Sequence, residues 1–260
     1  MSTARGSGYV AGDGVHLSLV IPVHNGGETD RLRGALATAA DWLCGQPGRS
    51  ELILVDDGSG PRTAEVLRDF AAETGVTLLV NQRNRGKGYA VARGMLASAG
   101  RFRVFTDADL AYPIEEVDRI LARLEAGSDI AIACRVLPDS RYVISPPFFR
   151  YLYTRHVMSR TFNWAVRHTL LPGLLDTQAG LKGFSARAAE LVFRNLTVAG
   201  FGFDVELLYV ARRLGLSIDQ TPVRFRYDSE PSTLHFTRDA VTMLGDLARI
   251  RWNGFRGRYR

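Results

Sequence analysis

The sequence has few cysteines and no long apolar run, and both absences exclude classes of protein. Its two cysteines, Cys44 and Cys134, form no C-x-x-C pair, which argues against a disulfide-stapled fold and suggests a reducing compartment. No apolar stretch approaches the roughly 18 to 20 residues of a membrane-spanning helix, so we expect a chain that is soluble or lies on a membrane. Residues 1–15 lack the apolar core of a secretory signal and are expected to be loosely ordered.

Two common nucleotide-binding signatures are also missing. No G-x-G-x-x-G follows the first apolar run, and no Walker A lysine motif occurs, which argues against dinucleotide and P-loop sites. Lys and Arg number 33 against 27 Asp and Glu, a net charge of +6. This balance suits a polyanionic ligand or an anionic membrane surface. Nucleic acid would also suit it, but no RNA-binding signature is present, so we expect no nucleic-acid partner.

Apolar runs of strand length alternate with segments of helical length through the first half of the chain. The expected strands cover 17–23, 51–55, 76–80, 102–106 and 129–134, and the expected helices cover 28–44, 61–73, 87–99 and 113–126. This alternation predicts right-handed βαβ units, and therefore an α/β fold with a Rossmann-like, mostly parallel sheet flanked by helices. In such sheets, ligands bind beyond the carboxyl ends of the strands.

The second half has a different character. Aromatic residues alternate with arginines over 143–168, a further helix is expected over 203–214, and 218–227 is extended. Residues 236–260 carry apolar residues at helical spacing and end in arginines, so we expect an amphipathic, basic C-terminal helix and tail. Its apolar stripe could face lipid, with the cations toward anionic head groups, or it could pack on the domain.

Polar clusters follow four of the expected strands, and one of them is a pair of acids. Asp107 and Asp109 come directly after the strand 102–106, and period-two geometry would put both carboxylates on one side of the chain. Carboxylates in this position favour Mg²⁺ or Mn²⁺, which would also bind phosphate oxygens. The alternative is a solvated turn. The other clusters are His24-Asn25, Asp56-Asp57 and Arg83-Asn84-Arg85-Gly86-Lys87.

Taken in order, these clusters resemble family 2 glycosyltransferases of the GT-A fold. The resemblance rests on Val20-Ile21-Pro22-Val23-His24-Asn25, Val55-Asp56-Asp57-Gly58-Ser59, Asn84-Arg85-Gly86-Lys87-Gly88 and Asp107-Ala108-Asp109. Within that family the sequence is most similar to dolichyl-phosphate β-glucosyltransferases and related polyprenyl-phosphate hexose synthases. The motifs that carry this narrower likeness are Asp107 through Glu115, Asp176-Thr177-Gln178-Ala179-Gly180-Leu181-Lys182, Phe203 through Tyr209, and Arg238-Asp239 through Arg251.

The sequence departs from that family's pattern at several points. Gly26 stands where members usually have Glu, and Cys134-Arg135 replaces the usual Ser-Arg. Pro231-Ser232-Thr233 replaces a Gly-Ser-Lys whose lysine lies near the pyrophosphate in the family. No apolar run of the sequence corresponds to the family's membrane-spanning N-terminal segment.

The resemblance implies a division of the chain and a set of roles. Residues 16–235 would form the GT-A catalytic domain, with the nucleotide-sugar half over 16–134 and the acceptor half over 135–235. Asp109 would bind the metal, and Asp107 would contact the ribose or the metal through water. The implied nucleotide-sugar contacts are Pro22, His24, Asn25, Asp56, Asp57, Lys87, Asp107 and Ala108. The implied acceptor contacts are Arg135, Arg141 and Gln178, and the implied catalytic residues are Asp176, Asp109 and Arg135.

The expected reaction is an inverting transfer of a hexose from a nucleotide sugar, first UDP-glucose and second GDP-mannose, to a polyprenyl or dolichyl phosphate. A hydroxyl acceptor would require a general base, whereas a phosphate, with its second pKa of about 6, is largely ionised near neutral pH. Asp176 is therefore either a base or an orienting residue. A soluble small-molecule acceptor and a non-catalytic nucleotide-sugar-binding module stay open as alternatives. The expected location is the cytoplasm, with peripheral association at the inner face of the membrane.

Overall fold

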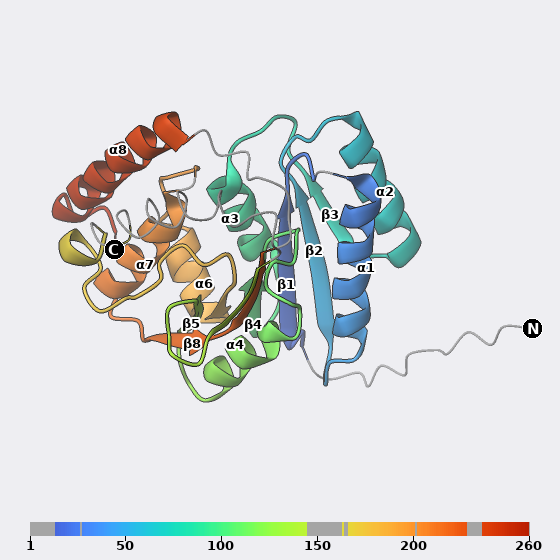
Figure 1. Cartoon of the computed structure of the whole chain (residues 1–260), viewed down its shortest axis with the longest axis horizontal. Coiled ribbons are helices and arrows are strands. Elements are labelled where there is room, and N and C mark those ends of the chain that lie inside the picture. Colours follow the sequence, from blue (N-terminus) through green and yellow to red (C-terminus); the bar gives the residue numbers. More distant parts are fainter. Residues whose placement is uncertain are drawn as a thin grey trace, which may run out of the picture.

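The central strand β1 (Leu17–Val23) is apolar except for Ser18, because both of its faces are covered by helices. The computed structural model describes residues 14–26, 28–144, 163, 166–200, 202–227 and 236–259. Within it, β1 belongs to a seven-stranded sheet of order β3-β2-β1-β4-β7-β5-β8 (Figure 1). The other strands of the sheet are β2 (Ser50–Asp56), β3 (Thr77–Val80), β4 (Phe102–Phe105), β5 (Ile130–Cys134), β7 (Lys182–Ser185) and β8 (Ile218–Pro222).

The sheet is parallel except for β7, which runs antiparallel to both of its neighbours, β4 and β5. A separate two-stranded sheet pairs β6 (Arg141–Ile144) with β9 (Arg224–Tyr227). The helices are α1 (Thr29–Cys44), α2 (Pro61–Thr74), α3 (Lys87–Ala97), α4 (Glu116–Glu125), α6 (Ala186–Phe193), α7 (Phe203–Arg213) and α8 (Phe236–Phe255). The predicted α/β architecture, with a mostly parallel sheet and a C-terminal helix, is confirmed.

Two apolar clusters cover the two faces of the sheet. Residues of α1, α2 and α4 pack on one face, and residues of α3, α6 and α7 pack on the other, with Ile250 of α8 joining them. Helix α3 comes very close to the sheet, since a Cβ at Gly94 would lie 2.4 Å from a methyl carbon of Val20. This close packing fixes the start of α3 above the carboxyl ends of β1 and β2.

Two local predictions differ from the structure. Helix α4 begins at Glu116 rather than at Pro113, because residues 113–115 form a turn in which Glu116 N–H donates to Pro113 O (2.9 Å) and Val117 N–H to Ile114 O (3.0 Å). Strand β4 ends at Phe105, so Asp107 and Asp109 lie in a turn with Leu110 at φ 46°. The turn, and not period-two alternation along a strand, is what brings these two acids together.

Several predictions concern residues outside the described part of the chain. These are the looseness of residues 1–13, most of the aromatic and arginine-rich stretch over 143–168, and Pro231-Ser232-Thr233. For Arg238 and Asp239 the structure describes the helical backbone only. The division of the domain into two halves at residue 135 stays a prediction. None of the described helices combines the length and the apolar character needed to cross a bilayer.

Candidate active site

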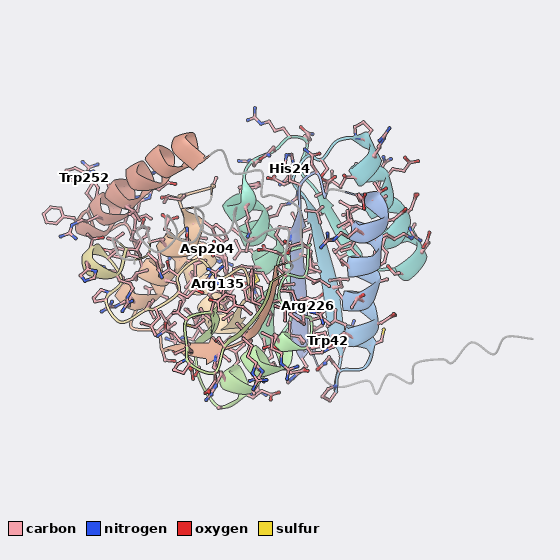
Figure 2. The ribbon with its side chains drawn as sticks, viewed as in Figure 1. His24, Trp42, Arg135, Asp204, Arg226 and Trp252 are labelled. Carbon is pink, nitrogen blue, oxygen red and sulfur yellow. The ribbon has the colours of Figure 1, made fainter. Side chains whose placement is uncertain are left out.

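The loops at one edge of the sheet gather nearly all the polar residues that the sequence singled out. The segments after β1, β2, β3, β4 and β5 meet at this edge because those strands are parallel. Strand β7 is antiparallel, so the loop 176–181 that precedes it arrives at the same edge. His24 thus follows β1, Arg135 follows β5, and Asp204 lies in the first turn of α7 (Figure 2).

Strand β1 ends in a loop that is tied to the loop after β2. Asn25 adopts a left-handed φ of 48°, its side-chain Oδ1 accepts from Gly60 N–H (2.8 Å), and its N–H donates to Ser59 Oγ (3.1 Å). His24 Nδ1 lies 2.9 Å from Asp57 O. Pro22 lies two residues beyond Val20, the last β1 residue paired with β4, so its missing N–H interrupts no pairing on that side.

The carboxylates of Asp56 and Asp57 are both buried and both engaged by the protein. Asp56 Oδ1 accepts from Ser59 N–H (2.8 Å). Asp57 accepts from Asn81 Nδ2 (2.7 Å), Arg85 N–H (3.0 Å) and Gly86 N–H (2.8 Å), which holds the β3–α3 loop against β2. In this structure the two acids shape the loops around the site, and their contact with a donor nucleotide stays a prediction.

Two open hollows lie on this side of the molecule. One, of about 910 Å³, opens beside Asn25, and its lining includes the first residues of α1 and α2. The other, of about 450 Å³, is lined by Val80, Asn81, Gln82, Arg83 and Arg85. Neither lining includes Asp107, Asp109 or Arg135, so the hollows offer room for a ligand but do not contain these charged residues.

A charged cluster lies after β4 and consists of Asp107, Asp109 and Lys87. Asp107 Oδ1 lies 2.5 Å from Lys87 Nζ, at the first residue of α3. Burial and the neighbouring Asp107 carboxylate raise the pKa of Asp109, whose Oδ1 accepts from Ala111 N–H (3.0 Å). Burial alone would lower the pKa of Lys87, but the carboxylates of Asp107 and Asp204 outweigh it and raise that pKa. Ala108 stands between the two acids.

The chemistry of this pair fits a divalent cation. Asp109 is held with its charge disfavoured by burial and by Asp107, and a bound cation would remove both penalties. Among the described residues no group of three or more His, Cys, Asp or Glu gathers as a metal site. Phosphate oxygens and water would therefore have to complete the coordination, which is how proteins commonly hold Mg²⁺.

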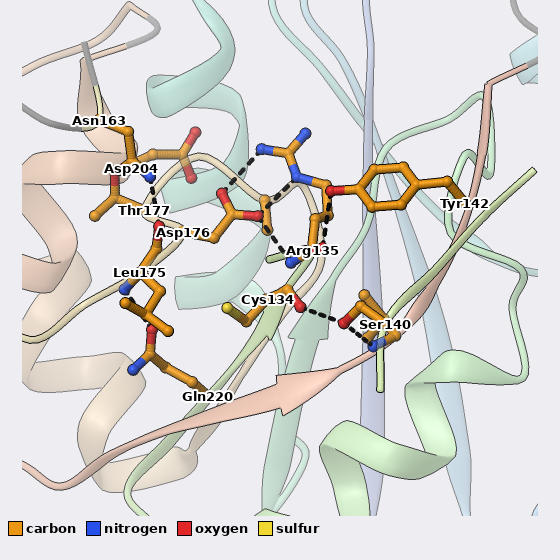
Figure 3. A network of polar contacts seen from close by, with 12 residues as sticks. Cys134, Arg135, Ser140, Tyr142, Asn163, Leu175, Asp176, Thr177, Asp204 and Gln220 are labelled. Atoms are coloured by element: carbon orange, nitrogen blue, oxygen red, sulfur yellow. Dashed lines mark hydrogen bonds and ion pairs between the residues drawn. The ribbon is translucent and has the colours of Figure 1, made fainter. Parts of the chain in front are cut away.

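Asp176 and Arg135 form a bidentate ion pair, shown in Figure 3. Asp176 Oδ2 accepts from Arg135 Nε (2.7 Å) and from Arg135 N–H (3.0 Å), and Oδ1 accepts from Nη2 (2.9 Å). Burial would raise the pKa of Asp176, but the Arg135 charge and its hydrogen bonds lower it. Within the described chain Arg135 Nη1 has no hydrogen-bond partner, so this guanidinium can still donate to an anion.

The two further residues predicted on the acceptor side differ in position. Gln178 is half-buried in the same loop as Asp176, two residues farther along. Arg141 is exposed at the start of β6, and no hydrogen bond joins it to the described pair Arg135–Asp176. Tyr142, the next residue, donates its hydroxyl to Arg135 O (2.8 Å). The structure thus brings Gln178 near the pair and leaves Arg141 at its border.

The sequence analysis missed a buried lysine below the cluster. Lys182 Nζ is fully buried and donates to Asp204 Oδ1 and to Ala179 O, each at 2.5 Å. Burial lowers the pKa of Lys182 and raises that of Asp204. The Ala179 contact ties the loop of Asp176 to α7. The signal available in the sequence was a lysine at the start of the short strand β7, KGFS.

Glu206, in the first turn of α7, has a structural role. Its side chain accepts from Thr197 N–H (2.8 Å), Val198 N–H (2.7 Å) and the Tyr259 hydroxyl (2.7 Å). The next residue along this loop, Ala199, accepts from Gly88 N–H (2.8 Å). Glu206 therefore links the end of the chain to the helix start that carries Lys87.

The Arg135–Asp176 pair should contribute stability that depends on pH. A lowered pKa means that Asp176 stabilises the folded protein above its unfolded pKa of about 3.9, and that this contribution is lost as pH falls through the lower folded pKa. An Arg135→Leu variant should lose it. In urea unfolding followed across pH, the wild type should be more stable near neutral pH, and the difference should shrink on acidification. A difference that does not change with pH would contradict the assignment.

The comparisons with known proteins agree with this geometry. The model of the family described as glycosyl transferase family 2 matches residues 18–190. The dolichyl-phosphate beta-glucosyltransferase of Dictyostelium discoideum is 30% identical over 251 residues, covering 92% of this chain and 75% of the relative. The protein of the same name from Homo sapiens is 31% identical, and the alignment covers 94% of this chain and 77% of that relative.

Solved structures share the fold at lower identity. Glucosyl-3-phosphoglycerate synthase of Mycobacterium tuberculosis, solved with Mn²⁺, UDP and glucosyl-3-phosphoglycerate, aligns with a TM-score of 0.65 at 20% identity. The alignment covers 95% of this chain and 86% of that one. The fold is therefore the GT-A fold that the sequence predicted, and the chain is a glycosyltransferase that belongs to glycosyl transferase family 2.

Proposed function

We propose that this protein transfers glucose from UDP-glucose to a polyprenyl phosphate, with inversion and with a divalent cation. Relatives named dolichyl-phosphate beta-glucosyltransferase, similar over most of the chain, support glucose as the transferred sugar and a polyprenyl phosphate as the acceptor. A cation held by Asp107 and Asp109 would neutralise charge that develops on the departing diphosphate. Lys87, which is paired with Asp107, would contact the same phosphates.

The state of Asp176 carries the proposal for the acceptor. A hydroxyl acceptor needs a general base that takes up its proton, and the best base has a pKa near the working pH. Asp176 instead has a lowered pKa and gives both carboxylate oxygens to Arg135. A phosphate monoester is already largely ionised near neutral pH and needs no base, since its second pKa is about 6. Asp176 then orients the Arg135 fork, and Nη1 of that fork faces the acceptor phosphate.

Transfer of radiolabel separates this function from its rivals. With radiolabelled UDP-glucose and Mn²⁺, label should move to decaprenyl phosphate in the organic phase and should not move to unphosphorylated decaprenol. Label found only in a water-soluble product, for example with 3-phosphoglycerate as acceptor, would defeat the lipid acceptor. Faster transfer from GDP-mannose would replace the donor. UDP binding without turnover on any acceptor would indicate a non-catalytic nucleotide-sugar-binding module.

Gly180 offers a test of the donor side in which no charged residue is substituted. A Cβ at position 180 would lie 2.1 Å from Asp107 Oδ2, so Gly180→Ala must displace that carboxylate. A displacement of about 1 Å in such a site costs about a hundredfold in rate, and we expect that loss in kcat. Gly34→Ala is the matched control, because Gly34 lies exposed in α1 with no atom within 4 Å of the added carbon. Equal activity of the two variants would argue that Asp107 is not at the reacting centre.

A further inference from the structure

The end of α8 exposes a pair of aromatic side chains. Trp252 is 58% exposed and Phe255 is 85% exposed, the highest value among the large apolar residues of the described chain. Their rings stack on one another with centroids 6.4 Å apart and an interplanar angle of 25°. Figure 2 shows Trp252 at the outer end of the helix, directed away from the sheet. Moving two such rings from water into an apolar environment would be strongly favourable, so their exposure indicates a binding surface.

The opposite side of α8 is fixed to the domain, so the aromatic pair cannot turn inward. Asn253 is buried and donates to Thr197 Oγ1 (3.1 Å), and a Cβ at Gly254 would lie 2.3 Å from the Tyr209 hydroxyl. Arg251 Nη1 donates to Thr169 O (2.9 Å). Beyond the helix, the Tyr259 hydroxyl donates to Glu206 (2.7 Å). These contacts set the rotation of the helix and direct Trp252 and Phe255 to solvent.

Arginines lie close to the aromatic pair along α8. Arg249 and Arg256 are exposed near it, and the Arg256 guanidinium lies 5.4 Å from the Trp252 ring centroid. The sequence from 245 to 260 contains five arginines and a single acid, Asp246. Asp246 is half-buried and packs at Gly202, on the side that faces the domain. The exposed face is thus apolar at its centre and positively charged around it.

We propose that this face, formed by Ala248, Arg249, Trp252, Phe255 and Arg256, docks the protein on the surface of an anionic lipid bilayer. The helix lies in the plane of the interface, its rings among the head groups and its arginines against lipid phosphates. A second copy of the chain fits less well, because a symmetric contact would oppose the same arginines. The inference deepens the proposed function, since a polyprenyl phosphate resides in a bilayer, but vesicle binding can be measured without turnover.

The docking face is rigidly connected to the donor side of the site. Tyr259 and the Thr197–Val198 backbone share the Glu206 carboxylate, and Ala199 accepts from Gly88 at the start of α3. Lys87 lies in that same first turn. A protein docked through α8 therefore keeps its charged cluster at a fixed distance from the lipid surface, which suits an acceptor presented from the bilayer.

Co-sedimentation with vesicles tests the proposal directly. The wild type should bind phosphatidylcholine vesicles that contain phosphatidylglycerol and bind pure phosphatidylcholine vesicles far less. Trp252→Ser/Phe255→Ser should weaken binding at least about tenfold, because each lost ring removes a large buried apolar surface. Arg249→Gln/Arg256→Gln should weaken it about fivefold per arginine, and less at high salt. Controls of matched chemistry on other helices are Leu96→Ser and Arg68→Gln, both exposed, which should bind like the wild type.

Activity on a short-chain, water-soluble polyprenyl phosphate separates failure of docking from failure of the proposed function. The aromatic double variant should keep wild-type turnover on that acceptor and lose it on acceptor embedded in anionic vesicles. Unchanged vesicle binding by this variant, or absence of wild-type binding, would overturn the docking face even if lipid glycosylation were observed. A wild-type dimer that the same substitutions convert to a monomer, or tighter binding of RNA than of vesicles, would also overturn it.

Discussion

Asp109→Ala is expected to lower kcat/KM for glycosyl transfer about a thousandfold, which corresponds to about 4 kcal/mol of transition-state stabilisation. A cation at the departing diphosphate contributes an effect of this size, and Asp109 is the acid best placed to hold it. Among the described residues its carboxylate accepts one hydrogen bond, from Ala111 N–H, and its pKa is raised by burial and by Asp107. Both observations are those expected of the proposed metal ligand.

The stability of Asp109→Ala shows whether its loss of activity comes from loss of cation binding or from unfolding. A raised pKa means that ionised Asp109 opposes folding near neutral pH, so Asp109→Ala should be no less stable than the wild type in urea. Binding of UDP in the presence of Mn²⁺, measured by calorimetry, should weaken in parallel with activity. Asp69→Asn, an exposed acid on α2, is the control for loss of one negative charge. Retention of Mn²⁺-dependent UDP binding by Asp109→Ala would refute the metal assignment.

The strands and loops around this site could be predicted from the sequence, because local sequence patterns determine where each strand ends. The run at 17–23 has the same bounds as β1, and the breaks expected after 55, 80 and 106 all fall at one edge of the sheet. Arg135 follows the expected strand 129–134, and the structure places it at the same edge after β5. Such predictions succeed because parallel strands buried on both faces must be continuously apolar, so polar residues mark their ends.

Which charged side chains pair with one another could not be predicted from the sequence in the same way. Asp57 is satisfied by Asn81 and by two backbone N–H groups of the loop after β3, a contact that exists only once β2 and β3 are side by side. Asp176 meets Arg135 only because β7 runs antiparallel between β4 and β5, which the run 171–184 does not reveal. Sequence spacing locates titratable groups, but tertiary packing decides which of them neutralise one another.

The buried pair of Lys182 with Asp204 is a further contact that the sequence does not predict, and replacing Lys182 should have a large effect on stability. Replacing it by Met leaves Asp204 buried, charged and without its partner, and breaking a buried pair in this way costs about 3–5 kcal/mol. Urea unfolding near neutral pH should show a loss of that size. The loss should shrink on acidification, because burial raises the pKa of Asp204 and a protonated carboxyl needs no cation.

The double variant Lys182→Met/Asp204→Leu separates stability from function. Two apolar side chains can replace a buried ion pair at little cost, so most of the lost stability should return. Activity should not return, because Lys182 Nζ also holds Ala179 O, and with it the loop that places Asp176 and Gly180. Recovery of both properties would mean that the pair serves the fold alone. Recovery of stability without activity would identify Lys182 as a positioning residue, with its effect falling on kcat more than on KM for the donor.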